Sequence, residues 1–105
     1  MNRFGGFGGG NMQAMMRQAQ KMQQDALKAK EELENSVFEG SASGGLVKVE
    51  INGAYEMQGI KIDPSVVDVD DIEMLEDLIV AAYNDASSKL EESKASKLGA
   101  FGGLI

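Results

Sequence analysis

One stretch, residues 44–64, most constrains what this chain can fold into, because it has the pattern of a β-hairpin. Val47, Val49 and Ile51 alternate with polar side chains, which is the period of two expected of a strand with one buried face. A hairpin alone is marginally stable in water. We therefore expect the rest of the chain to supply a cover for this apolar face.

The turn of the hairpin is predicted at residues 52–53, Asn-Gly, which tolerate positive φ at both centres of a type I′ turn. A two-residue turn would place Ile51 opposite Ala54 and start a second strand that ends at Ile62, before Asp-Pro. Gly59 is a candidate bulge within that strand. The residues expected on the buried face are Val47, Val49, Ile51, Ile60 and Ile62.

A long helix is predicted over residues 12–34, with Asn11 as its N-cap. Its apolar positions recur at spacings of three and four, as in a heptad seam. The seam consists of Met12, Met15, Ala19, Met22, Ala26, Ala29 and Leu33. Such a stripe is best explained as a face that packs on another helix, of the same or a partner chain. The glycine-rich residues 1–10 are expected to be a flexible tail.

A second helix is predicted after Pro64, with Asp70 as N-cap and Glu73 completing a capping box. Its apolar stripe consists of Ile72, Leu75, Ile79, Ala82, Ala86 and Leu90. Gly99 is expected to end the helix and to begin a second flexible tail, residues 99–105. Residues 37–42 can form a short strand before the hairpin, which makes a minimal three-stranded sheet.

Together these elements predict an α+β fold of order α-β-β-β-α, with a small three-stranded antiparallel sheet and two long helices. The domain would span residues 11–98, between the two tails. A single chain leaves most of the first helix without a partner, so we expect a homodimer.

Composition excludes several kinds of chemistry. The sequence has no Cys and no His, which removes thiolate chemistry, the usual zinc ligands and a Ser-His triad. We expect no cofactor, no metal, no small-molecule substrate and no enzymatic activity. The longest apolar run, residues 78–83, is far too short to span a membrane, and no secretory signal is evident, so we expect a cytoplasmic protein.

Charge is distributed unevenly along a chain whose formal net charge is -7. Residues 1–30 carry five basic side chains against Asp25 alone, whereas residues 31–92 carry sixteen acids and three lysines. Lys94 and Lys97, near the end of the second predicted helix, add two more basic side chains. Basic ends around an acidic middle indicate an electrostatic partner at the ends.

Several segments in this order resemble the YbaB/EbfC family of small bacterial nucleoid-associated proteins. They are MRQAQKMQ at 16–23, GLVKV at 45–49, ING at 51–53, IDPS at 62–65, EMLEDL at 73–78 and NDA at 84–86. The resemblance implies a tweezer-like dimer that binds double-stranded DNA with little sequence preference and acts in nucleoid organisation or gene regulation. Family members often carry more basic residues in the second hairpin strand, where this chain has Glu56, Met57 and Gln58.

The family has no fixed base-reading motif, so the expected DNA contacts fall on the basic helix positions. These are Arg17, Lys21, Lys28, Lys94 and Lys97. A solvated helix face is the commoner explanation of such residues from sequence alone. An alternative function, favoured by the net charge and the Met-rich seam, is a protein-interaction module that makes no direct DNA contact.

Overall fold

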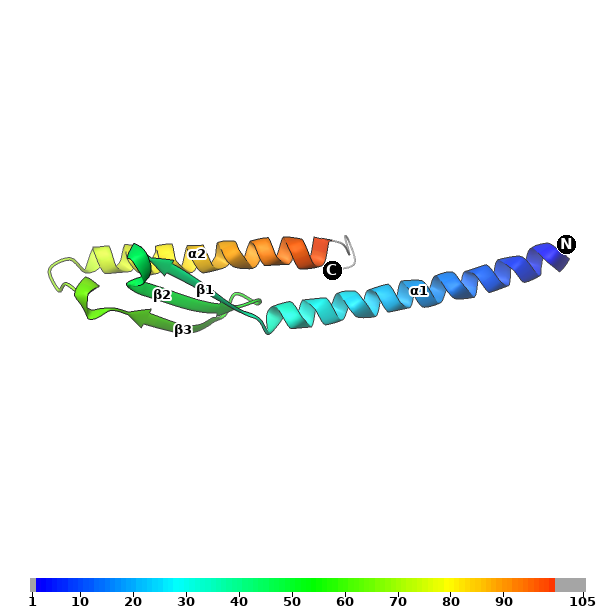
Figure 1. Ribbon diagram of the computed structural model, residues 1–105, viewed down its shortest axis with the longest axis horizontal. Helices are drawn as coiled ribbons and strands as arrows, with labels where there is room; N and C mark the ends of the chain where they lie inside the picture. The colour runs from blue at the N-terminus through cyan, green and yellow to red at the C-terminus, as the bar shows by residue number, and fades with distance from the viewer. Residues whose placement is uncertain (1, 100–105) are drawn as a thin grey trace.

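The computed structural model describes the backbone of residues 2–99 and the side chains of residues 11–99. Its elements follow the predicted order α-β-β-β-α (Figure 1). They are α1 (Asn2–Glu34), β1 (Val37–Ala42), β2 (Val47–Asn52), β3 (Met57–Ile62) and α2 (Ile72–Leu98), with single 3-10 turns at Ser43–Gly45 and Pro64–Val66. The molecule is strongly elongated, 84 × 17 × 16 Å, because α1 continues past the end of α2.

The three strands form one antiparallel sheet with β2 in the centre. Val49 of β2 lies between Gly40 of β1 and Ile60 of β3, and directly opposite residues share a face of the sheet. The predicted alternation of β2 is confirmed, since Val47, Val49 and Ile51 are fully buried. The other face of the sheet, which carries Lys48 and Glu50, is more exposed and polar.

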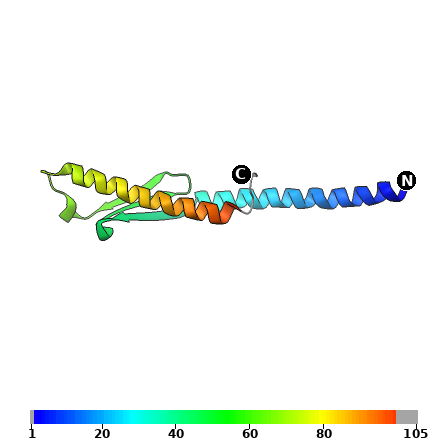
Figure 2. The same ribbon diagram turned by 90° about the horizontal axis from the view of Figure 1, so that it is seen from above.

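Helix α2 covers β1 and β2 on the apolar face (Figures 1 and 2). The helix crosses the sheet very closely at Gly40, where any side chain would overlap the Ala82 carbonyl and the Ala86 backbone. The buried apolar core consists of Leu33, Val47, Val49, Ile51, Val66, Ala82, Ala86, Leu90 and Leu98. The predicted α2 stripe is thus confirmed at Ala82, Ala86 and Leu90, while Ile72 stays 45% exposed.

The predicted two-residue hairpin turn is wrong. Four residues, Gly53 to Glu56, separate the strands, and Ile51 pairs with Met57 instead of Ala54. The physical reason is Asn52, whose Oδ1 accepts hydrogen bonds from the N–H groups of Ala54 (2.9 Å) and Glu56 (3.0 Å) and so organises a wider loop. Positive φ falls on Tyr55, at 65°.

Gly53 has a different role from the one predicted for it. A side chain at this position would overlap the Leu33 carbonyl, and the Gly53 N–H donates to the Glu34 carbonyl at 3.3 Å. The glycine therefore lets the hairpin loop pack against the last turn of α1. The predicted irregularity near Gly59 is confirmed, since the register shifts just after the Glu50–Gly59 pair.

Helix α1 begins at Asn2, so Asn11 lies inside the helix and is not its N-cap. Glycine weakens a helix but keeps the backbone N–H that proline lacks, so a glycine-rich segment can continue one. The flexibility expected of residues 1–10 stays a prediction. Of the tail expected at residues 99–105, only Gly99 lies within the described residues.

The capping residue of α2 is Asp71, one position later than predicted. Its Oδ1 accepts a hydrogen bond from the Met74 N–H (3.2 Å), whereas Asp70 belongs to a preceding turn in which its N–H donates to Asp68 (2.9 Å). The helix ends at Leu98, before Gly99, as expected.

Candidate nucleic-acid interface

Three of the predicted contact residues lie on α1. Arg17 and Lys21 are one helical turn apart, Lys28 follows two turns later, and all three are exposed. We call residues 2–25 of α1 the arm and the rest of the described chain, residues 26–99, the body. Arg17 and Lys21 therefore belong to the arm, which projects beyond the end of α2 (Figure 1), and Lys28 lies where the arm joins the body.

The apolar seam of α1 changes its surroundings at this same junction. Ala26 and Leu33 are 1% and 2% exposed, so this part of the seam is buried within the body. Met15 and Met22 of the arm are 66% and 48% exposed. From residue 11 to residue 25 the arm is thus a helix whose apolar stripe and basic side chains are both accessible.

The two remaining predicted residues, Lys94 and Lys97, lie in the last two turns of α2. The α2 end packs beside the end of α1, since Leu33 and Leu98 share one core. The Lys94 Nζ lies 5.9 Å from the centre of the Tyr55 ring, within the range of a cation–π contact. This contact holds Lys94 near the hairpin loop.

A groove of about 220 Å³ lies where α1, the hairpin loop and α2 meet. Its lining residues are Lys30, Leu33, Glu34, Gly53, Lys94 and Leu98. It brings together Lys30 and Lys94, which are far apart in the sequence. Sequence reasoning missed Lys30; the available signal was its position one turn before Leu33, the seam residue at the helix–helix contact.

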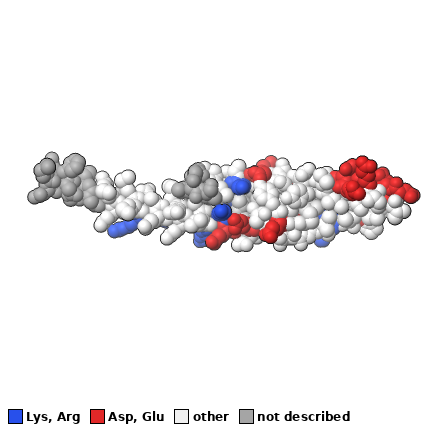
Figure 3. Space-filling view, turned by 180° about the vertical axis from the view of Figure 1, so that it is seen from behind, with Lys and Arg blue, Asp and Glu red and all other residues white. Residues whose placement is uncertain are grey.

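The structure therefore brings Lys30 and Lys94 together at the α1–α2 junction, with Lys28 and Lys97 within a turn of them along their own helices, while Arg17 and Lys21 lie on the arm. Acidic side chains collect at the opposite end, around the start of α2 (Figure 3). The acids of that end are Asp63, Asp68, Asp70, Asp71, Glu73, Glu76 and Asp77. Residues 11–24 of the arm thus carry basic side chains and no acid, whereas the lysines of the junction lie among Glu31, Glu32, Glu34, Glu91 and Glu92.

The polar face of the sheet does not continue the basic surface. Lys48 and Lys61 are paired across β2 and β3, but Glu39 and Glu50 occupy the neighbouring row. The Lys48 Nζ lies 4.0 Å from a Glu39 carboxylate oxygen. The balanced charge of this face, together with the absence of added basic residues at positions 56–58, makes it a poor surface for a polyanion.

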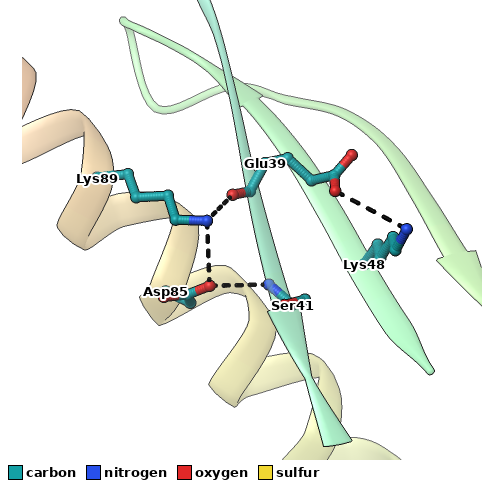
Figure 4. Close-up of polar contacts among 5 residues, drawn as sticks. All are labelled: Glu39, Ser41, Lys48, Asp85 and Lys89. Carbon is teal, nitrogen blue, oxygen red and sulfur yellow. Dashed lines mark hydrogen bonds and ion pairs between the residues drawn. The ribbon is translucent and has the colours of Figure 1, made fainter. Parts of the chain in front are cut away.

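Asp85 and Lys89 of α2 form hydrogen bonds with the backbone of β1 (Figure 4). The Ser41 N–H donates to Asp85 Oδ2 at 3.0 Å, and Lys89 Nζ donates to the Glu39 carbonyl at 2.8 Å. The hydrogen bond from Ser41, with a smaller contribution from Lys89, lowers the pKa of the Asp85 carboxyl. A similar bond from the Ser65 N–H lowers the pKa of Asp63.

In the part of the chain that the structure describes, acidic side chains nowhere gather in threes as ligands for a metal ion. Neither helix in that part has a stretch that is both long and apolar enough to cross a membrane.

The fold and the position of its basic side chains define a class of protein: a small α+β body from which one long basic helix projects. Comparison with known proteins gives the family of the chain. It belongs to the YbaB/EbfC DNA-binding family, whose model matches residues 8–104.

Similar proteins are called nucleoid-associated proteins. One from Mycobacterium bovis is 52% identical over 97 residues, which is 92% of this chain and 73% of the relative. One from Clostridium botulinum is 50% identical over 95 residues, 90% of this chain and 84% of the relative. The crystal structure of an uncharacterized protein from Helicobacter pylori has the same fold, with a TM-score of 0.66 at 24% identity, covering 87% of this chain and 94% of that one.

Proposed function

We propose that this protein binds double-stranded DNA as a homodimer with little sequence specificity. It would act in the nucleoid, within the cytoplasm, in nucleoid organisation and gene regulation. The observation that carries the proposal is the separation of charge. Arg17 and Lys21 lie on the arm with no acid before Asp25, while a large acidic cluster of a chain with net charge -7 lies at the far end, around the start of α2.

The chemistry of the basic surface favours contacts with phosphates. Lysine and arginine side chains that meet the DNA backbone fix its position without reading its sequence. Arg17 and Lys28 are eleven residues apart, about 16 Å along the helix axis, so the surface can contact several phosphates. The acidic end would repel DNA, so we expect affinities of about 10⁻⁴ to 10⁻⁶ M that fall steeply with salt.

Dimerisation is supported by the apolar surface that one chain leaves uncovered. Large apolar side chains are exposed on the arm, on β3 and on α2. A second copy would cover part of this surface and would double the number of basic arms. Two arms that project from one dimer give the tweezer-like arrangement implied by the family, with a contact surface on each arm.

Fluorescence anisotropy with a labelled DNA duplex, measured against salt concentration, tests the DNA proposal. The variant Arg17→Glu/Lys21→Glu should bind about tenfold or more weakly at low salt, because each arm loses two phosphate contacts. Lys48→Glu/Lys61→Glu on the polar face of the sheet is the matched control, since it changes the net charge equally. No binding by the unaltered protein, or equal losses in both variants, would overturn the proposed interface.

A second function is favoured by the methionines of the arm. Met12, Met15, Met16 and Met22 are 48–66% exposed, and methionine surfaces adapt to varied partners. The alternative is a module that binds another protein through these side chains without contacting DNA. Capture of partners from lysate before and after nuclease treatment separates the two functions, because partners held through DNA are lost with it.

A further inference from the structure

We infer that the arms of two copies of this chain pair with each other, antiparallel, through their methionine-bearing faces, and so join two DNA-bound molecules. We call this face the arm seam and define it by Met12, Met15, Ala19 and Met22. The pairing uses neither the sheet nor α2. The joining of DNA rests on the proposed function, whereas the pairing itself is tested without DNA.

The arm seam is the accessible part of a longer heptad stripe. The same spacing of three and four residues continues into the body at Ala26 and Leu33, which are 1% and 2% exposed. Met12, Met15 and Met22 are instead 48–66% exposed. A regular heptad stripe is the pattern by which one helix packs along another. The described chain supplies no such neighbour for this part of the stripe (Figures 1 and 2).

The basic side chains of α1 lie on the far side of the helix from the arm seam. At about 100° per residue, Arg17, Lys21 and Lys28 fall within about 40° of one another and about 160° from the middle of the seam. In a heptad these positions point away from a paired helix. Pairing therefore leaves the cations of both arms free to meet phosphates, on opposite outer sides of the pair.

The positions that flank the arm seam carry no charge. They hold Asn11, Met16, Gln18 and Gln23. Charged side chains at such positions set the choice of partner in paired helices, and like charges there would repel an identical helix. An uncharged flank permits a second copy of the same arm, although each whole chain carries -7. It offers no complementary side chain to a helix of either charge.

The body determines the direction of the pairing. It lies on the seam side of α1, since the buried Ala26 and Leu33 belong to the same stripe. In a parallel pair, the two bodies would lie at the same level on the side where the helices meet, and they would overlap. In an antiparallel pair the bodies lie at opposite ends of the contact.

The heptad register sets which residues meet. In an antiparallel pair the two kinds of seam position face each other, so Met12 lies opposite Met15 of the second copy, and Met15 lies opposite its Met12. This register also places residue 2 opposite residue 25, so each arm ends where the other body begins. The centre of the contact consists of four methionine side chains, which adapt their shapes to one another.

The contact is short, because the arm seam extends over residues 12–22, about 15 Å of helix. Pairing is therefore weak between free molecules in dilute solution. Molecules bound to DNA hold their arms at a high local concentration, which makes a weak contact effective. Two duplexes are then joined by paired arms, and each duplex is held by an outward basic face.

Disulfide cross-linking tests the pairing without DNA, because the chain has no cysteine of its own. In concentrated protein with a glutathione redox buffer, Met12→Cys mixed with Met15→Cys should give mainly the mixed disulfide, identified by mass spectrometry. Met22→Cys alone should give little product, since the register separates the two copies of this residue by about 25 Å along the axis. Gln20→Cys, outside the seam, is the matched control. A mixed product no more abundant than the Gln20→Cys dimer, or an abundant Met22→Cys dimer, would overturn the inference.

Retention of a second duplex tests the joining of DNA. Beads that carry one duplex should retain a labelled duplex when the unaltered protein is present. Met15→Gln/Met22→Gln should lose most of this retention and still bind a single duplex normally, because glutamine keeps the charge and the helix propensity of the arm. Gln20→Ala/Gln24→Ala, outside the seam, is the control and should keep the retention.

The two failures can be told apart. Full retention by Met15→Gln/Met22→Gln would overturn the joining of DNA through paired arms and leave the proposed DNA binding standing. No binding of the unaltered protein to a single duplex would instead overturn the proposed function. The cross-linking result on the pairing would be unaffected by that second outcome.

Discussion

The arm and the body of this molecule are built from the same kinds of element but are stabilised in different ways. In the body, α2 lies across the sheet and buries Leu90 completely. In the arm, Met15 is 66% exposed, and among residues 2–99 the helix has no neighbour along most of this length (Figure 2). A buried apolar side chain stabilises a fold by about 1.5–3 kcal/mol, whereas an exposed one contributes little.

The difference separates the part of the chain that fixes the fold from the part that is free to bind. The body can hold its shape with its own contacts. The arm presents basic and apolar side chains that a partner can still reach, and helical stability in proteins usually comes from packing of such an apolar face. We therefore expect substitutions in the body to change stability and substitutions in the arm to change binding.

The largest effect should come from Leu90→Ala, which removes a fully buried side chain on the face of α2 that packs on the sheet. The free energy of unfolding should fall by about 2–5 kcal/mol. Met15→Ala in the arm is the paired control and should change it by no more than about 0.5 kcal/mol. Urea unfolding followed by circular dichroism measures both. A loss of more than about 1 kcal/mol in Met15→Ala would show that the arm is packed in solution and would break the comparison.

A smaller loss is expected of Gly40→Ala, because its added methyl group would enter the backbone of α2 at Ala82 and Ala86. Overpacking of this kind costs about 1–3 kcal/mol, and a helix backbone cannot move aside as a side chain can. Gly59→Ala, on β3 where α2 does not reach, has a 3.9 Å contact with Glu50 and should leave the urea midpoint nearly unchanged. Equal losses of stability in both variants would mean that the loss in Gly40→Ala does not come from contact with the backbone of α2.

Much of the body could be predicted from local sequence patterns. The alternation around Val47 and Val49 and the apolar stripe of α2 specify which side of each element is buried, and the structure confirms both. The hairpin turn could not be predicted in the same way. Its loop is set by the two hydrogen bonds to the Asn52 side chain and by the contact of Gly53 with Leu33, and the second of these depends on tertiary packing.

The candidate interface was predictable only in part for the same reason. The exposed basic positions of α1 could be found from helical spacing, but the groove shared by Lys30 and Lys94 exists only because the two helix ends pack together. Likewise, Ile60 and Ile62 follow the apolar pattern of a buried strand. Their exposure comes from the width of α2, which covers two strands and not three.

The smallest effect we predict is a change in how the body responds to acid. The hydrogen bond from the Ser41 N–H, more than the Lys89 contact, lowers the pKa of Asp85 in the folded chain. A carboxyl with a lower pKa in the folded state stabilises that state above its unfolded pKa of about 4, and this contribution is lost as pH falls through the folded pKa.

Asp85→Asn should therefore make the loss of stability between neutral and acid pH shallower, as measured by urea unfolding at a series of pH values. Lys89→Met removes the 3.6 Å ion pair with Asp85 but keeps the bond from Ser41, so it should retain most of the pH dependence of the unaltered protein. If Lys89→Met flattened the profile as much as Asp85→Asn, the ion pair would be the main cause. The contacts of α2 with the outer edge of β1 would then be mainly electrostatic. Their contribution to stability would fall as salt is added.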